Sequence, residues 1–367
     1  MGIHRWLDQV ESEASLPQVL AERCVHSLIE QASCRACVDA CPRAAWLLDD
    51  EELGLDTEAC DGCGLCVPAC PQAAIEQQHR PRAYQYKDQG VAVVACERAG
   101  VLGDGVMPCV HSLGLTEFLR LYSQGVRKLL FTRGDCSHCE RAAIPGSFEQ
   151  LIENLRQLLR SHGLPPMSLR EYSPPEWQTR REFLLRASQA QGVSRRGFLR
   201  ELLAEAAEHC QQPDASQRGM EQVVRLSDVL PEGAAKGLFP HVPRIDPGRC
   251  IACGACVNLC PHGAIRLHQQ PPRYTLAASH CSGCGICVDI CDPQALTLAA
   301  WTHSEGQVVE LLESVCEVCG IPFRYPTLQP PKHSLCPACA VAGRKKWRLF
   351  EVEGGESSFE GPPASRA

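Results

Sequence analysis

Apolar residues in the middle of the chain follow two alternating periodicities. Residues 91–95 (VAVVA) and 128–132 (KLLFT) are apolar runs with the length of a β-strand. After each run, apolar residues recur at every third or fourth position, which predicts helices over residues 115–122 and 148–159. Strand–helix alternation is typical of a parallel α/β unit, and we expect one over residues 83–172.

Elsewhere the apolar segments are very short, and one pattern repeats. A cysteine run followed by a short apolar segment occurs four times, with the apolar segments at residues 44–46, 73–75, 264–265 and 295–296. Residues 46–48 predict a strand that leads into an exposed acidic turn at residues 49–52. One cysteine run with its apolar segment is therefore half of a module. Two such halves make up each module, and the modules lie over residues 23–80 and 243–300.

Three segments lie outside these repeats. Residues 1–22 predict a short amphipathic arm, and residues 353–367 are rich in Gly, Ser and Pro and predict a disordered tail. Residues 173–242 are charged and predict a helical linker with two helices. The segment from Thr179 to Glu182 has the spacing of a capping box, and Ser194 is a candidate N-cap, so we expect helices to open at both places.

The 25 cysteines of the chain indicate its chemistry. Three runs have the spacing C-x2-C-x2-C-x3-C and a fourth is incomplete; the runs are Cys60, Cys63, Cys66 and Cys70; Cys250, Cys253, Cys256 and Cys260; Cys281, Cys284, Cys287 and Cys291; and Cys34, Cys37 and Cys41. Zinc and disulfides are alternatives for such runs. Three complete repeats, with Pro after three of the fourth cysteines, favour iron–sulfur clusters, because one tight loop presents three thiolates to one cluster.

This spacing resembles that of bacterial-type ferredoxins with two [4Fe–4S] clusters, in which the fourth cysteine of each run binds the other cluster. In the first module Gln31 stands where a cysteine is expected, and we predict that Cys24 replaces it. The alternative is that Cys24 is a buried free thiol and that the cluster has three ligands or is absent. The resemblance implies four ligand sets: Cys24, Cys34, Cys37 and Cys70; Cys41, Cys60, Cys63 and Cys66; Cys250, Cys253, Cys256 and Cys291; and Cys260, Cys281, Cys284 and Cys287.

Four more cysteines fall in the α/β unit. Cys96 lies at the end of the first predicted strand, Cys109 lies in a loop, and Cys136 and Cys139 follow the second strand. Ligand sites in α/β units lie at these ends of the strands. The segment resembles the small iron–sulfur subunit that links nickel–iron hydrogenases to heterodisulfide reductase, in Met107-Pro108-Cys109, the helix from Gly114 and Gly134-Asp135-Cys136, although the additional upstream cysteine of that family is here Glu97 or Arg98. We expect a [2Fe–2S] cluster; zinc and reduced thiols are the alternatives. We expect His138, inside the CxxC, to be a solvated loop residue rather than a ligand.

A zinc ribbon is predicted over residues 301–352. Cys316-x2-Cys319 and Cys336-x2-Cys339 form two knuckles that supply four thiolates to one tetrahedral ion. A single iron could use the same ligands, and zinc is favoured. Cys210 then stands alone. The fold class we expect is a multidomain α+β protein in which two ferredoxin-like dicluster modules flank a small α/β domain, with the zinc ribbon towards the C-terminus.

Charge and composition limit the partners. A net charge of −7 argues against nucleic acid, and the chain has no apolar stretch long enough for membrane insertion and no apolar segment typical of a secretory signal. Residues 194–200 (SRRGFLR) resemble a twin-arginine motif, but they lie mid-chain and charged residues follow. The same stretch resembles the start of the accessory ferredoxin of periplasmic nitrate reductase. Cluster thiolates need a reducing compartment, so we expect a cytoplasmic protein.

The sequence carries no fingerprint of an independent reaction. No GxGxxG lies between a strand and a helix, and no P-loop or HExxH occurs. We therefore expect an electron carrier with four [4Fe–4S] clusters, one further cluster and one zinc, which relays single electrons between redox proteins such as a flavoprotein or molybdoenzyme. Two alternatives stay open: an iron–sulfur subunit of a hydrogenase, formate dehydrogenase or heterodisulfide-reductase-type complex, and a non-enzymatic maturation or regulatory factor for a molybdoenzyme.

Overall fold

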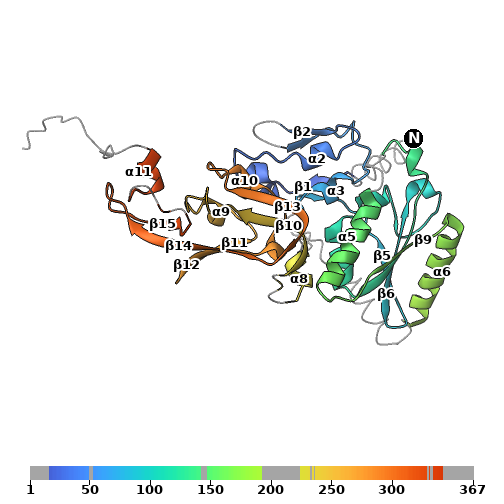
Figure 1. Cartoon of the computed structure of the whole chain (residues 1–367). Helices are drawn as coiled ribbons and strands as arrows, with labels where there is room; N and C mark the ends of the chain where they lie inside the picture. Colours follow the sequence, from blue (N-terminus) through green and yellow to red (C-terminus); the bar gives the residue numbers. More distant parts are fainter. Residues whose placement is uncertain are drawn as a thin grey trace, which may run out of the picture.

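The structure is a computed structural model that describes residues 16–48, 53–141, 147–191, 224–231, 234, 236–328, 330 and 334–341. It is a mixed α/β structure (Figure 1). The α/β unit lies at the right of the view, the second module at the centre, and the first module above them both. The arm at 1–15, the acidic turn at 49–52, the predicted helix at Ser194, Cys210 and the tail at 353–367 lie outside the described residues. No helix in the described ranges has the length and apolarity needed to cross a bilayer.

The first module consists of short elements around its cysteines. Strands β2 (Trp46–Leu48) and β3 (Leu53–Leu55) form an antiparallel hairpin, as the apolar pattern predicted for β2. Strand β1 (Gln18–Val19), within the expected arm, pairs with β4 (Ile75–Glu76). Two one-turn helices, α2 (Ala36–Asp39) and α3 (Cys66–Ala69), pack on each other, and the 3-10 turns η1 (Ala21–Arg23) and η2 (Val25–Ser27) flank Cys24.

The second module repeats this plan with longer strands. Strand β10 (Gly237–Ile245) pairs with β13 (Leu296–Ser304), so residues 237–242, expected in the linker, belong to this sheet. Helices α9 (Ala255–Asn258) and α10 (Ile286–Asp289) correspond to α2 and α3. Strands β11 (Ile265–Gln269), β12 (Pro272–Leu276), β14 (Gln307–Val315) and β15 (Pro322–Pro326) form one sheet in that order. The predicted ribbon, whose last described element is α11 (Pro337–Val341), therefore shares a sheet with the module.

The α/β unit has the two strands and two helices that the periodicity predicts. Its sheet has the order β5 (Arg82–Tyr86), β6 (Gln89–Cys96), β8 (Val126–Thr132) and β9 (Ser168–Glu171), with β7 (Val106–Met107) beside β6. Strands β6, β8 and β9 are parallel, and β5 is antiparallel. Helices α4 (Leu115–Ser123) and α5 (Ser147–Ser161) cover one face of the sheet, because alternate residues of β6 share a core with them.

The opposite face is covered by α6 (Pro174–Gln191), which the sequence had assigned to the linker. Trp177 is fully buried there, and its indole N–H donates to the carbonyl of Leu130 at 3.1 Å. The capping box at Thr179 was a wrong prediction, because Thr179 lies inside α6 and its hydroxyl donates back to the Pro175 carbonyl. The helix begins five residues earlier, where Ser173 donates to the Glu176 carboxylate at 2.7 Å.

The three units pack together. Leu238 and Phe239 of β10 are buried in the same core as α4 and α5, and α8 (Leu226–Val229) joins them. His162, just after α5, contacts the Leu238 carbonyl at 3.1 Å. The two modules flank the α/β unit along the sequence, but in the structure they also contact each other, with α10 beside the first module (Figure 1).

Candidate metal centres

One turn recurs after each fourth cysteine and directs an amide at its sulfur. The alanine four residues on donates its N–H to Sγ at 3.4, 3.3, 3.2 and 3.2 Å; the pairs are Ala45 and Cys41, Ala74 and Cys70, Ala264 and Cys260, and Ala295 and Cys291. The residue before each alanine has a positive φ. Asp292 and Pro293, which reverse the usual order, leave this turn unchanged. N–H···S bonds stabilise thiolates and tune the potential of a bound cluster.

We name the four groups of cysteines by position: set A is Cys24, Cys34, Cys37 and Cys70; set B is Cys41, Cys60, Cys63 and Cys66; set C is Cys250, Cys253, Cys256 and Cys291; and set D is Cys260, Cys281, Cys284 and Cys287.

In set A, Cys24 is buried between η1 and η2, whereas Gln31 is exposed. Burial raises the pKa of the Cys70 thiol, and the nearby Cys34 and Cys24 raise it further. Burial raises the pKa of Cys37 to about 11, and the nearby Cys70 and Cys34 add to it. The structure thus brings Cys24 to the group that the incomplete run would otherwise leave with three thiols.

Set B is the more buried group of the first module. Burial raises the pKa of Cys66 to about 12; Cys63 and Cys60 add to this, while a hydrogen bond from Trp46 opposes it. Cys60 lies close enough to Cys41 for the two to interact electrostatically. Cys66 and Cys37 pack in one apolar cluster around Trp46 and Ile75, so sets A and B share a core.

The second module shows the same pairing. Burial raises the pKa of Cys256 to about 12, and the nearby Cys250, Cys253 and Cys291 add to it. Burial raises the pKa of Cys287 to about 12, and the nearby Cys281, Cys284 and Cys260 add to it. Cys256 of the neighbouring set also contributes. Cys253 is exposed, so set C reaches the surface.

These sets fit a cofactor larger than one ion. Four thiolates grouped in an apolar environment are unfavourable unless cationic charge compensates them, and metal binding then displaces the thiol protons. In the described part of the chain, only the group at residues 316–339 brings three or more ligand atoms within 4.8 Å of one another. The ligand atoms of sets A to D do not meet this criterion for a single ion.

Another cysteine group, which we name set E, lies at the strand ends of the α/β unit and consists of Cys96, Cys109, Cys136 and Cys139. Burial raises the pKa of Cys109 to about 12, and Cys96, Cys63 and Cys136 add to it. Cys139 interacts with Cys136. His138 has a side chain that is 85% exposed and is bound to Asp135 at 2.8 Å, so it lies away from the group.

The sequence offered no reason to select His111, yet it lies at set E. Its Nε2 is 3.6 Å from the Cys136 Sγ, and burial lowers its pKa. It follows Cys109 by two residues and lies in η4 (Val110–Ser112), and its imidazole lies near the CxxC of Cys136 and Cys139. Its Nδ1 is buried without a partner among the described residues. A neutral imidazole here can donate one hydrogen bond to a thiolate.

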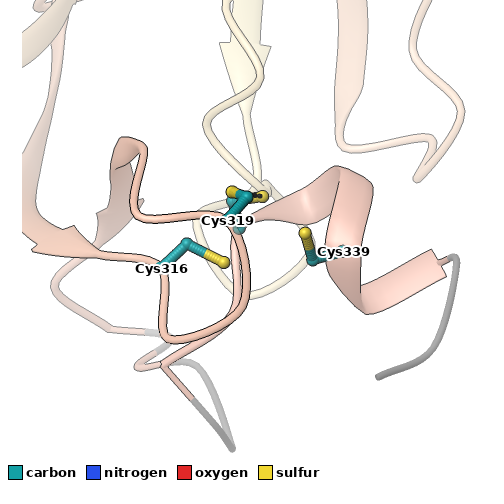
Figure 2. A group of neighbouring side chains, drawn as sticks. Cys316, Cys319 and Cys339 are labelled. Atoms are coloured by element: carbon teal, nitrogen blue, oxygen red, sulfur yellow. Dashed lines mark hydrogen bonds between the residues drawn. The ribbon is translucent and has the colours of Figure 1, made fainter. Parts of the chain in front are cut away.

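The last group, in the predicted ribbon, is compact. Cys316 and Cys319 come from the turn between β14 and β15, and Cys339 comes from α11 (Figure 2). The Sγ atoms of Cys319 and Cys336 are 3.8 Å apart. Backbone N–H groups of Cys319 and Cys336 lower the pKa of Cys316 to about 6, whereas burial and the other thiols raise that of Cys339 to about 12. All four ligand atoms lie within 4.8 Å of one another, which fits a single tetrahedral ion.

Two family models, each described as a 4Fe-4S binding domain, match the chain at two places apiece. One matches residues 54–76 and 243–266, and the other matches residues 21–44 and 278–292. The chain carries ferredoxin-type 4Fe-4S binding domains. Every cysteine of sets A to D, including Cys24, lies within one of these matches. No curated protein matches the chain, so the two finer resemblances stay hypotheses.

Proposed function

We propose that the chain is a multi-cluster electron-transfer protein in which sets A, B, C and D each hold one [4Fe–4S] cluster. The observation that carries the proposal is the turn that recurs four times, with a cysteine followed by an amide aimed at its sulfur. A bound cluster supplies one-electron transfer, which needs no acid or base from the protein. The chain contributes burial, N–H···S bonds and fixed spacing between the sets.

Set E is the fifth centre in this proposal, and a [2Fe–2S] cluster is the cofactor we assign to it. Its support is the convergence of Cys96, Cys109 and Cys136, because each interacts electrostatically with another cysteine of the group. The compact group at residues 316–339 is proposed to hold structural zinc, since four thiolates close the ion against other ligands.

The partners we propose are redox proteins, of the hydrogenase, formate dehydrogenase, molybdoenzyme or flavoprotein classes, in the cytoplasm.

Metal content tests the proposed cluster loading directly. Protein purified without oxygen should contain about 16 to 18 iron atoms and about one zinc ion per chain. Iron near eight would contradict the loading of both modules. The reduced protein should pass electrons to an artificial acceptor, and direct reduction of the isolated chain by NADH or formate would overturn the carrier function.

A further inference from the structure

The two ferredoxin-type modules meet at a small junction, and the hydrogen bonds found across it in the described part of the chain lie beside cysteines of set A and set D. The backbone N–H and hydroxyl of Ser33 donate to the Asp289 carboxylate at 2.9 and 2.7 Å. Ser33 precedes Cys34 of set A, and Asp289 follows Cys287 of set D by two residues.

Apolar side chains seal the same junction. Val25 and Ile29 of the first module bury Ile286 of α10, which is 1% exposed. Cys34 of the first module and Cys284 of the second both pack against this cluster. A cysteine of set A and a cysteine of set D therefore pack against one shared apolar cluster.

Gln72 connects the two modules at a second point. It is 9% exposed, and it lies two residues after Cys70 of set A. Its Oε1 accepts from the Ser282 hydroxyl at 3.4 Å and from the Nε2 of His262. Ser282 is next to Cys281, and His262 follows Cys260 by two residues, so one side chain touches two cysteine-bearing loops of set D.

Set B faces the other way, towards set E. Cys63 and Cys109 are both buried in one small cluster with Leu65. Arg141 joins the surrounding loops: it donates to Asp61, beside Cys60, at 2.8 Å and to Glu97, beside Cys96, at 2.6 Å. Sets B and E are thus held in contact in the same way as sets A and D.

We propose that the five sets form one unbranched relay in the order C, D, A, B, E, and that Gln72 is the positioning residue that fixes its central junction. The inference rests on the proposed function, because it assumes loaded sets. Three of the four steps join cysteines that belong to the same apolar cluster: Cys37 with Cys66, Cys34 with Cys284, and Cys63 with Cys109. The fourth joins Cys256 and Cys287, which interact electrostatically and pack in one core. Electron tunnelling falls steeply with distance, so the central junction controls exchange between the modules.

Pulsed EPR on anaerobic, partially reduced protein tests the order, since it reports magnetic dipolar coupling between centres without any enzymatic assay. In the unaltered chain we expect coupling between the two modules. Gln72→Leu combined with Asp289→Ala should keep the iron content and lose the resolved inter-module splitting. Gln269→Leu is the matched control, because Gln269 accepts from Arg324 at 2.5 Å, in an exposed position on β11 away from the junction. It should leave the splitting unchanged.

A second pair of variants decides the matter if the junction variant loses iron. Cys24→Ser removes a set A ligand and should abolish the inter-module splitting, whereas Cys253→Ser, at the terminal set C, should preserve it. A fully iron-loaded chain without inter-module coupling would overturn the relay but not the proposed function. An unaltered chain with iron near eight would instead contradict the proposed function. Unchanged splitting in both the junction variant and Cys24→Ser would also refute the order.

Discussion

Arg141 provides a quantitative test of how the first module is attached to the α/β unit. The side chain is only 9% exposed and makes four hydrogen bonds, to the Asp61 carboxylate and carbonyl, to Glu97 and to the Pro108 carbonyl. Burial tends to lower the pKa of Arg141, but Asp61 and Glu97 outweigh burial and hold the pKa above its ordinary value. The guanidinium therefore stays charged, and its N–H groups donate both to Asp61 of the first module and to Glu97 of the α/β unit.

Arg141→Met keeps the aliphatic stem and removes all four bonds. A hydrogen bond to a charged group contributes about 1.5 to 3 kcal/mol when it is buried. Glu97 is 44% exposed and Asp61 is 20% exposed, so solvent screens part of the gain. We expect local opening of this contact to become easier by about 2 to 3 kcal/mol, which corresponds to roughly 30- to 150-fold faster amide exchange.

Hydrogen exchange on anaerobic protein, followed in peptides covering residues 60–66 and 97–99, measures this effect. Arg43→Met is the matched control, because Arg43 binds the same Asp61 at 3.4 Å and Glu140 at 2.7 Å, but its side chain is 37% exposed. Exposed ion pairs contribute little, so exchange should hardly change. If both variants accelerated amide exchange equally, burial of the Arg141 guanidinium would not be what stabilises the contact.

Three further changes test individual sites. Cys24→Ser should remove the EPR signal of one cubane or convert it to a three-iron form, while Cys210→Ser leaves the spectrum unchanged; identical behaviour would contradict Cys24 as a ligand. Trp46→Phe should make the set B potential more negative, because the indole hydrogen bond that favours the thiolate of Cys66 is lost; redox titration would show no shift if that bond does not reach the cluster. Cys339→Ser should lower zinc content without lowering iron content, and loss of both metals would show that the ribbon is needed to load the modules.

Local spacing predicted much of what positions the sites. Strands β6 and β8 and helices α4 and α5 of the α/β unit followed from apolar periodicity, and the hairpin strand at Trp46 followed from its place after a cysteine run. The start of α6 was missed although a signal was present. The segment Ser173-Pro-Pro-Glu176 also has the spacing of a capping box, with Pro at the first helical position. The helix begins there and not at Thr179.

The contacts between units could not be read in this way. Gln72 and Ser282 are 210 residues apart, and Arg141 and Asp61 are 80 residues apart, so neither contact has a local pattern. The β14 strand was likewise assigned to a separate ribbon, because its pairing with β12 depends on a long-range register. Propensity and spacing specify each loop, whereas the packing of one unit on another depends on side chains that look ordinary in the sequence.

The repeated turn itself explains why these junctions lie so close to the sulfurs. Position two after the fourth cysteine is Arg43, Gln72 or His262 in three of the four turns. Arg43 reaches Glu140 of the α/β unit, and Gln72 and His262 reach each other across the two modules. The amide two positions later donates to the sulfur, whereas this side chain contacts a neighbouring unit. Duplication of one loop thus supplies both a thiolate and, from the same turn, the contact that holds the next set of thiolates nearby.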